Sequence, residues 1–274
     1  MSLTDKSAFD LLGKVALVTG GLGILGRPFC EGLAERGASV VVVDLDEGKC
    51  TQFAAKVARQ YGNPAMGVGC DVAEPESVRS MTERVVRELG GLHILINNAA
   101  SKSNDVASFF APFETYTLNQ WRDILAVNLD GAFLVAQSVG NQMISQGTGG
   151  SIVQMSSIYG LLGPDDRIYE GSSYLGVSIN TPAVYSASKA GIVGLTRYLA
   201  TRWARYGIRV NCITPGGVQS GQNDTFVNRY SARVPLQRMA RPEDLVGPMV
   251  FLASAASSYI TGQNLFVDGG LSAW

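Results

Sequence analysis

The stretch VALVTGGLGILG, residues 15–26, decides the fold because it joins an apolar run to a glycine-rich turn. Gly21, Gly23 and Gly26 form a GxGxxG pattern, and residues 26–37 continue with helical spacing. Such glycines permit a tight turn and let the backbone approach a pyrophosphate, while the helix N-terminus offers free N–H groups. The stretch therefore predicts a dinucleotide site, which includes Gly20, Gly21, Gly23, Ile24, Leu25 and Gly26.

An acid ends the next apolar run. Asp44 lies 18 positions beyond Gly26, after the run SVVVV. A carboxylate at this point accepts hydrogen bonds from the adenosine ribose hydroxyls and repels a 2′-phosphate. Asp44 therefore favours NAD over NADP as the cofactor.

Short apolar runs alternate with longer segments of helical spacing along the chain. The runs cover residues 15–19, 39–44, 65–71, 93–97, 151–156, 208–214 and 264–268, and the helical segments cover 26–37, 47–60, 76–89, 119–146, 184–206 and 242–254. Alternation of this kind predicts βαβ units with right-handed crossovers. We expect an α/β fold: a Rossmann-type, doubly wound parallel sheet of about seven strands in a single domain, residues 1–274.

Three stretches lack clear periodicity, at residues 99–117, 160–183 and 215–240. Each follows an expected strand. Ligands in open α/β sheets bind beyond the carboxyl ends of the strands. These stretches are therefore expected to surround the active site.

Composition excludes several classes of protein. Lys+Arg number 22 against 23 Asp+Glu, so no basic surplus indicates nucleic acid or an anionic membrane. The apolar runs are too short to cross a bilayer, and the polar N-terminus does not resemble a secretory signal. The four cysteines form no CxxC pair and there is one histidine, so we expect buried thiols, no metal site and a cytoplasmic protein.

The segment Tyr185-Ser-Ala-Ser-Lys189 opens an expected helix. Residues at i and i+4 share one helix face, so the ammonium would lie near the phenol. A nearby cation stabilises a phenolate and lowers the pKa of the tyrosine, which could then transfer a proton at neutral pH. The segment predicts an acid/base pair.

At this point the chain resembles the short-chain dehydrogenase/reductase family, from Lys14 to about Gly270. The likeness rests on an ordered series of motifs: the glycine-rich turn, Asp44, Cys70-Asp71-Val72, Asn97-Asn98-Ala99-Ala100, Val127-Asn128, Met155-Ser156-Ser157, YSASK, Asn211-Cys-Ile-Thr-Pro215-Gly216 and the ending Thr261-Gly262 with Val267-Asp268-Gly269-Gly270. The resemblance implies an NAD-dependent oxidoreductase that moves a hydride between nicotinamide and a secondary alcohol or ketone.

The resemblance also implies roles for single residues. Tyr185 would be the acid/base, Lys189 would lower its pKa and hold the nicotinamide ribose, and Ser157 would position the substrate oxygen. Asn128 would hold a water that links Lys189 to a proton relay. The remaining cofactor contacts implied are Asp71 and Val72 at the adenine, Asn98 and Ala99 near the adenosine ribose, and Pro215, Gly216 and Val218 at the nicotinamide.

The chain departs from the usual pattern of the shorter, single-domain members in three places. Position 24 is Ile, so the turn reads TGxxGxxG, as in the extended branch of the family. Ala100 replaces the glycine of NNAG. The connection from Ser157 to Tyr185 is long and includes an inserted segment, residues 164–182, with Arg167, Glu170 and Tyr174.

This inserted segment is polar and aromatic, which suits a polyol or sugar-like substrate. It also has a weak likeness to members linked to bacterial surface-sugar pathways. A contact with another subunit is the alternative role for the segment. Since helices 119–146 and 184–206 carry more apolar residues than one buried stripe needs, a homo-oligomer, tetramer or dimer, is expected.

Two other functions stay open from the sequence. The TGxxGxxG turn suggests a lyase or isomerase acting on sugar nucleotides with transiently bound NAD, although no long C-terminal substrate region follows. A non-catalytic NAD-binding protein is the other alternative. The intact set Asn128, Ser157, Tyr185 and Lys189 argues against it.

Overall fold

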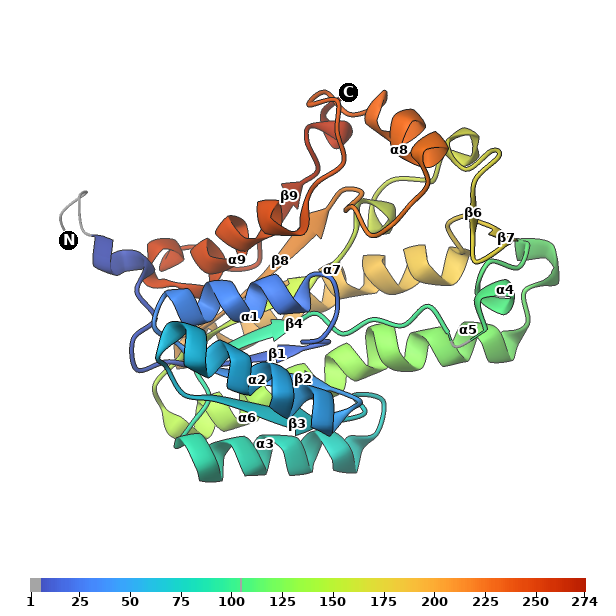
Figure 1. Ribbon diagram of the computed structural model, residues 1–274. Coiled ribbons are helices and arrows are strands. Elements are labelled where there is room, and N and C mark those ends of the chain that lie inside the picture. The colour runs from blue at the N-terminus through green and yellow to red at the C-terminus, as the bar shows by residue number, and fades with distance from the viewer. Residues whose placement is uncertain (1–5, 104) are drawn as a thin grey trace.

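The computed structural model describes residues 6–103 and 105–274 and contains one seven-stranded parallel sheet between two layers of helices (Figure 1). The strand order is β3-β2-β1-β4-β5-β8-β9. The strands are β1 Val15–Thr19, β2 Ser39–Asp44, β3 Ala65–Gly69, β4 Ile94–Asn97, β5 Gly150–Met155, β8 Ile208–Pro215 and β9 Asn264–Val267. The prediction of a doubly wound α/β sheet is confirmed, and the strand bounds differ from the expected ones by at most two residues.

Helices cover both faces of this sheet. The α-helices are α1 Gly26–Glu35, α2 Glu47–Tyr61, α3 Pro75–Leu89, α4 Val106–Phe109, α5 Leu118–Leu125, α6 Ala132–Gln146, α7 Ala183–Trp203, α8 Asp224–Ser231 and α9 Val246–Ala253. Apolar side chains of α1, α2 and α9 pack on one face, and those of α3, α6 and α7 pack on the other. The two cores explain why the strands read as nearly continuous apolar runs, since both of their faces are covered.

The central strands show this double burial clearly. Leu17 of β1 and Val41 of β2 pair in register and are fully buried in one core, and the next pair, Val18 and Val42, is fully buried in the other. Burying one such side chain contributes roughly 1.5–3 kcal/mol. The four cysteines are all buried and free, as expected.

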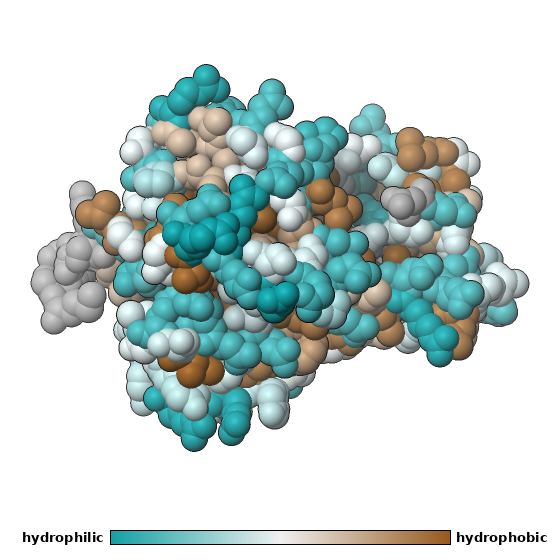
Figure 2. Space-filling view, turned by 90° about the horizontal axis from the view of Figure 1, so that it is seen from below, coloured by the Kyte–Doolittle hydropathy of each residue, from teal (hydrophilic) through white to brown (hydrophobic). Residues whose placement is uncertain are grey.

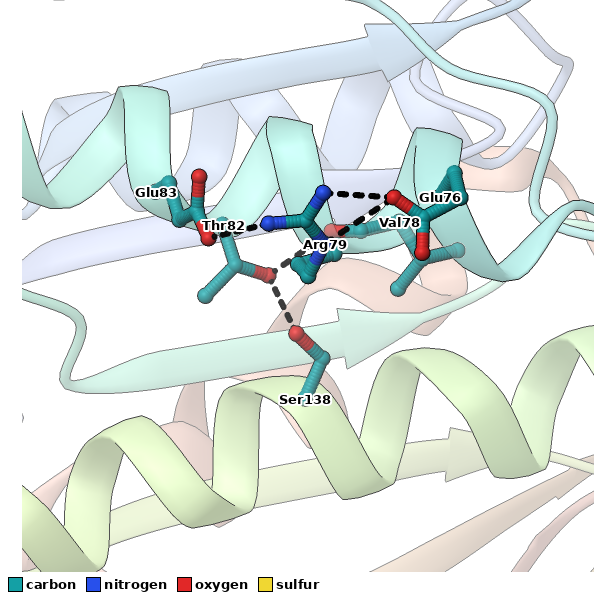
Figure 3. Close-up of polar contacts among 6 residues, drawn as sticks. All are labelled: Glu76, Val78, Arg79, Thr82, Glu83 and Ser138. Atoms are coloured by element: carbon teal, nitrogen blue, oxygen red, sulfur yellow. Dashed lines mark hydrogen bonds and ion pairs between the residues drawn. The ribbon is translucent and has the colours of Figure 1, made fainter.

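The outer helix α3 illustrates how the layers separate core from solvent. Figure 3 shows the hydroxyl of Thr82 bridging to Ser138 of α6 at 2.8 Å, while Arg79 pairs with Glu76 and Glu83 along the exposed side of α3.

The view from below in Figure 2 is mostly hydrophilic, with apolar residues in separate small patches. No helix of the described chain has both the length and the apolar character needed to cross a bilayer.

The structure corrects the expected helix over residues 119–146. It is divided into α5 and α6 by a π-helical turn, Ala126–Gly131. A π-helical turn contains one residue more than an α-helical turn and is often found at functional sites. Here it carries Asn128, which is 1% exposed.

The three stretches without periodicity contain short elements that sequence patterns did not reveal. The first contains α4, the third contains α8, and the second contains a small antiparallel hairpin, β6 Ser173–Tyr174 and β7 Val177–Ser178. In Figure 1 the hairpin lies near α4, beyond the N-terminal end of α7. All three stretches therefore lie around the carboxyl ends of the strands, as expected.

Candidate active site

The glycine-rich turn connects β1 to α1 beside the end of β4. Gly20 has φ 62°, in the left-handed region, and a Cβ there would lie 3.0 Å from Cα of Ala99. A Cβ on Gly26 would lie 2.0 Å from the carbonyl oxygen of Gly20, so the start of α1 can approach the turn only without a side chain. No side chain caps α1. An uncapped helix N-terminus above a glycine cradle fits a dinucleotide pyrophosphate.

The turn also receives support from its neighbours. Asp44 Oδ2 accepts a hydrogen bond from the Leu22 N–H at 3.0 Å, and its Oδ1 accepts one from the Leu45 N–H at 2.9 Å. A carboxylate has about four acceptor sites, so Asp44 keeps capacity for ribose hydroxyls. Ile24 is half exposed on this turn, whereas Leu25 lines the cavity described below.

Asn98 is committed to the turn itself. Its Nδ2 donates to the carbonyl oxygens of Thr19 at 3.0 Å and Gly20 at 3.2 Å. The N–H groups of Asn98 and Ala99 both donate to the Thr19 hydroxyl at 3.0 Å. The Asn98 side chain therefore fixes the shape of the turn.

The other expected cofactor residues lie at the carboxyl ends of β3 and β8. Asp71 is exposed and accepts a hydrogen bond from the Ala73 N–H, while Val72 is buried in the core beside α3 and α6. Pro215 ends β8, and the Gly216 N–H donates to the Val267 carbonyl at 3.0 Å. Pro215, Gly216 and Val218 line the same cavity as Leu25 and Asn98.

Tyr185 and Ser157 meet in that cavity from α7 and from the end of β5. Burial raises the pKa of Tyr185, and a hydrogen bond with the side chain of Ser157 offsets part of this increase. Ser157 is 8% exposed and is followed by a short turn, residues 158–160, that packs against α7. Gly160 permits this approach, because a Cβ would lie 2.7 Å from the Lys189 carbonyl carbon.

Lys189 lies one turn after Tyr185, with its Nζ 5.8 Å from the centre of the Tyr185 ring. The side chain is 5% exposed, and its ammonium donates to the Met155 carbonyl at 3.0 Å. Burial lowers the pKa of Lys189 to about 8. The expected i, i+4 pairing is thus present, and the ammonium can stabilise negative charge on the Tyr185 oxygen.

Asn128 binds backbone instead of the catalytic pair. Its Oδ1 accepts from the Ser101 N–H at 2.7 Å, and its Nδ2 donates to the Ser101 carbonyl at 3.4 Å. The π-helical turn that carries Asn128 also packs on α7, where Leu129 lies against Gly191. Asn128 therefore joins the loop after β4 to the layer that holds Tyr185 and Lys189.

A cavity of about 380 Å³, a size typical of small-molecule sites, is lined by Leu25, Asn98, Ser157, Tyr185, Lys189, Pro215, Gly216 and Val218. Besides the residues above, its wall includes side chains from all three aperiodic stretches: Lys102, Phe109 and Phe110 from the first, Tyr169, Ser173, Tyr174, Ile179, Asn180 and Thr181 from the second, and Ser220, Gln222, Asn223 and Phe226 from the third. Sequence reasoning placed the stretches correctly, but it singled out only Tyr174 among these residues.

The inserted segment, residues 164–182, joins the cavity wall to α8. Tyr169 stacks on Phe226, and Asp165 pairs with Arg233 at 2.5 Å. Of the side chains expected to reach a substrate, Tyr174 lines the cavity. Arg167 instead pairs with Asp165 at 2.7 Å and is largely exposed, and Glu170 is exposed beside Arg229. Tyr174 is therefore the one of the three that lines the cavity, whereas Arg167 and Glu170 form ion pairs outside it.

The arrangement can move a proton between a phenol and a substrate oxygen beside a bound dinucleotide. It combines a hydroxyl pair, a buried ammonium and a largely apolar cavity at one end of a glycine-rich cradle. Within residues 6–103 and 105–274, no cluster of three or more potential metal-ligating side chains is found.

The chain is similar to known proteins over nearly its whole length. A family model described as enoyl-(acyl carrier protein) reductase matches residues 23–272. The chain is 33% identical to 2-dehydro-3-deoxy-D-gluconate 5-dehydrogenase of Dickeya dadantii (96% of this chain, 97% of that protein) and 35% identical to D-threitol dehydrogenase of Mycolicibacterium smegmatis (96% and 94%). A crystal structure of a gluconate 5-dehydrogenase from Burkholderia cenocepacia with NADP and tartrate has a TM-score of 0.85 at 34% identity, covering 98% of each chain.

Proposed function

This chain belongs to the short-chain dehydrogenase/reductase family and is an NAD(P)-dependent oxidoreductase acting on CH–OH groups; from that premise we propose that its substrate is a polyol or sugar-like alcohol, or the matching ketone, and that NAD is the preferred cofactor. The main support is the meeting of Ser157, Tyr185 and Lys189 in one cavity beside the glycine-rich turn. Relatives that act on a sugar acid and on threitol add support for the substrate class.

In the proposed mechanism Tyr185 transfers the proton of the substrate hydroxyl. Ser157 holds the substrate oxygen, and the Lys189 ammonium lowers the energy of the Tyr185 phenolate. Bound nicotinamide would supply the redox chemistry, as the acceptor or donor of hydride. Asn128 acts at a distance by fixing the backbone at Ser101.

The proposed cofactor preference rests on Asp44. Its carboxylate follows β2 and is tied to the turn at Leu22, so its negative charge is fixed near the start of α1. A 2′-phosphate placed there would be repelled, whereas ribose hydroxyls would donate to the carboxylate. The remaining cofactor contacts proposed are the turn from Gly20 to Gly26, Asp71, Val72, Asn98, Ala99, Pro215, Gly216 and Val218.

We also propose a homo-oligomer that uses α6 and α7. Phe133 of α6 and Tyr198 of α7 are 44% and 64% exposed, and they line one surface groove together with Trp203. Exposed apolar side chains that gather in one groove favour association. Sedimentation that gives a monomer at micromolar protein would contradict this.

A panel of polyols, sugars and sugar acids, each tested with NAD and NADP, examines the proposed function. Net formation of NADH from at least one of these alcohols is the expected result. Product formation without net NADH would favour a lyase or isomerase, and NAD binding without turnover on any panel member would favour a non-catalytic protein. The cytoplasmic location and the surface-sugar likeness remain predictions.

A further inference from the structure

The charged side chains that line the substrate cavity are all positive. Among the described residues that line it, the charged side chains are Lys102 and Lys189, and there is no aspartate or glutamate. Lys189 lies deep, bonded to the Met155 carbonyl beside Tyr185. Lys102 is therefore the cavity's accessible cation, and its charge has no compensating carboxylate on the wall.

The position of Lys102 is set by the loop after β4. Asn128 holds both the N–H and the carbonyl of the preceding residue, Ser101, and the Ser101 hydroxyl accepts a hydrogen bond from the Ser103 N–H at 3.0 Å. Ser103 has φ 68°, in the left-handed region, so the chain turns sharply just after Lys102. The turn that carries Asn128 packs on α7 through Leu129, and Asn128 fixes the backbone next to Lys102.

The side chain of Lys102 points toward the inserted segment. Its Nζ lies 5.7 Å from the centre of the Tyr174 ring, and Tyr174 also lines the cavity. No carboxylate of the described residues lies within 4.0 Å of the Lys102 ammonium. An aromatic face attracts a cation but leaves its N–H donors free for an anion.

Asn180 also lines the cavity and helps to hold the inserted segment in place. Asn180, near the end of the inserted segment, donates from Nδ2 to the Phe110 carbonyl at 2.8 Å, which fixes the amide. Its Oδ1 is buried and accepts no hydrogen bond from the described residues. Because this oxygen is sealed from the cavity, the amide of Asn180 serves to hold the inserted segment against the loop that contains Phe110.

We propose that the substrate is a polyhydroxy carboxylic acid whose carboxylate binds Lys102. This inference rests on the proposed function and narrows its substrate class from sugar-like alcohols to their acids. A charge-assisted hydrogen bond between ammonium and carboxylate is stronger than a neutral one, and the partly apolar wall strengthens it further. The reacting CH–OH group would then be presented to Tyr185 at a distance from the charged end.

The test compares pairs of substrates that differ only in a carboxylate. D-gluconate is compared with D-sorbitol, and D-xylonate with xylitol, by the kcat/KM of NADH formation at saturating NAD. We expect the acid to exceed the polyol at least about tenfold in wild type. Lys102→Gln should lower the acid-to-polyol ratio about 10–100-fold, whereas Lys102→Arg should retain most of the ratio because the positive charge remains.

Lys56→Gln is the matched control. Lys56 is an exposed lysine paired with Glu31 on the outside of α2, so its loss should leave the ratio unchanged. The KM for NAD should also stay unchanged in Lys102→Gln. A large rise in that KM would mean that Lys102 serves the cofactor phosphates and would overturn the inference.

Failure of the inference and failure of the proposed function give different results. If polyols are oxidised as well as their acids, or if Lys102→Gln lowers both equally, the carboxylate assignment is wrong while the proposed function stands. If neither class is oxidised, the proposed function fails, and thermal stabilisation of the NAD-loaded protein then decides the inference. Stabilisation by D-gluconate but not by D-sorbitol, lost in Lys102→Gln, would support it, and its absence would overturn it.

Discussion

The two ends of the cavity are built in different ways. At the cofactor end, the site consists mainly of backbone: a glycine-rich turn and the uncapped start of α1. Hydrogen bonds from the side-chain amide of Asn98 fix the turn between β1 and α1. At the substrate end, side chains from three separate stretches form the wall, supported by a small cluster around Ile168, Phe226 and Tyr230 and by ion pairs at Asp165. A site made by backbone requires particular residues at fixed spacing, whereas a site made by side chains tolerates many sequences.

The largest expected effect comes where the two ends meet. Tyr185→Phe keeps the ring and its packing but removes the proton that is transferred, so kcat should fall about 10³–10⁴-fold. NAD affinity, measured by titration calorimetry, should change little. Retained activity would show that Tyr185 is not the acid/base.

Lys189→Met tests whether the buried charge is retained for function at a cost in stability. We expect kcat to fall about 10²–10³-fold, because the phenolate loses its nearby cation. Since burial lowers the pKa of Lys189 from 10.5 to about 8, the unfolded chain binds more protons between these values, and wild-type stability rises with pH across that window.

The same substitution should therefore stabilise the protein by about 1–3 kcal/mol at pH 7. The difference from wild type should shrink between about pH 8 and 10.5, which denaturant unfolding at several pH values can measure. A variant less stable than wild type at pH 7 would contradict this account of the buried ammonium.

Gly26→Ala tests the cofactor end alone. Its Cβ would lie 2.0 Å from the Gly20 carbonyl oxygen, so the turn must shift. We expect NAD affinity to fall about 10–100-fold, or about 1.4–2.8 kcal/mol. Gly247→Ala on α9, where a Cβ meets nothing within 4 Å, is the matched control and should bind NAD as wild type does.

Asp44→Ala should have a smaller effect at the same end. Removal of the carboxylate takes away both the ribose hydrogen bonds and the repulsion of a 2′-phosphate, so the NAD-to-NADP ratio of kcat/KM should fall about tenfold, or about 1.4 kcal/mol. A wild-type enzyme that already prefers NADP would refute the argument from Asp44. The polyol-to-acid preference should not change, because the substrate end is built separately.

The smallest expected effect belongs to the substrate end. Tyr174→Ala should lower kcat/KM on the true substrate about fivefold, or about 1 kcal/mol, because the side chain lines the cavity but is 42% exposed. Arg167→Ala is the comparison, since Arg167 pairs with Asp165 outside the cavity. If Arg167→Ala lowers kcat/KM more than Tyr174→Ala does, the inserted segment affects catalysis through its own stability and not through direct contact with the substrate.

The sequence alone predicted the bounds of each sheet strand to within two residues, and it also predicted the glycine-rich turn at the cofactor end. Parallel strands covered on both faces must be apolar along their length, and a turn that meets a helix and a neighbouring strand without room for Cβ must contain glycine. The pairing of Tyr185 with Lys189 in the YSASK segment was also predictable, because residues at i and i+4 lie on one face of a helix.

The tertiary structure decided what local patterns could not. The π-helical turn at Asn128 interrupts a segment whose apolar pattern predicts one continuous helix, and this turn packs on α7 and bonds to Ser101. Lys102 lies in the loop after β4, whereas Tyr174 and Asn180 belong to the inserted segment, yet all three line one cavity. These residues come together because contacts with distant elements fix the paths of their loops, which local sequence patterns do not predict. The charge of the cavity depends on that arrangement.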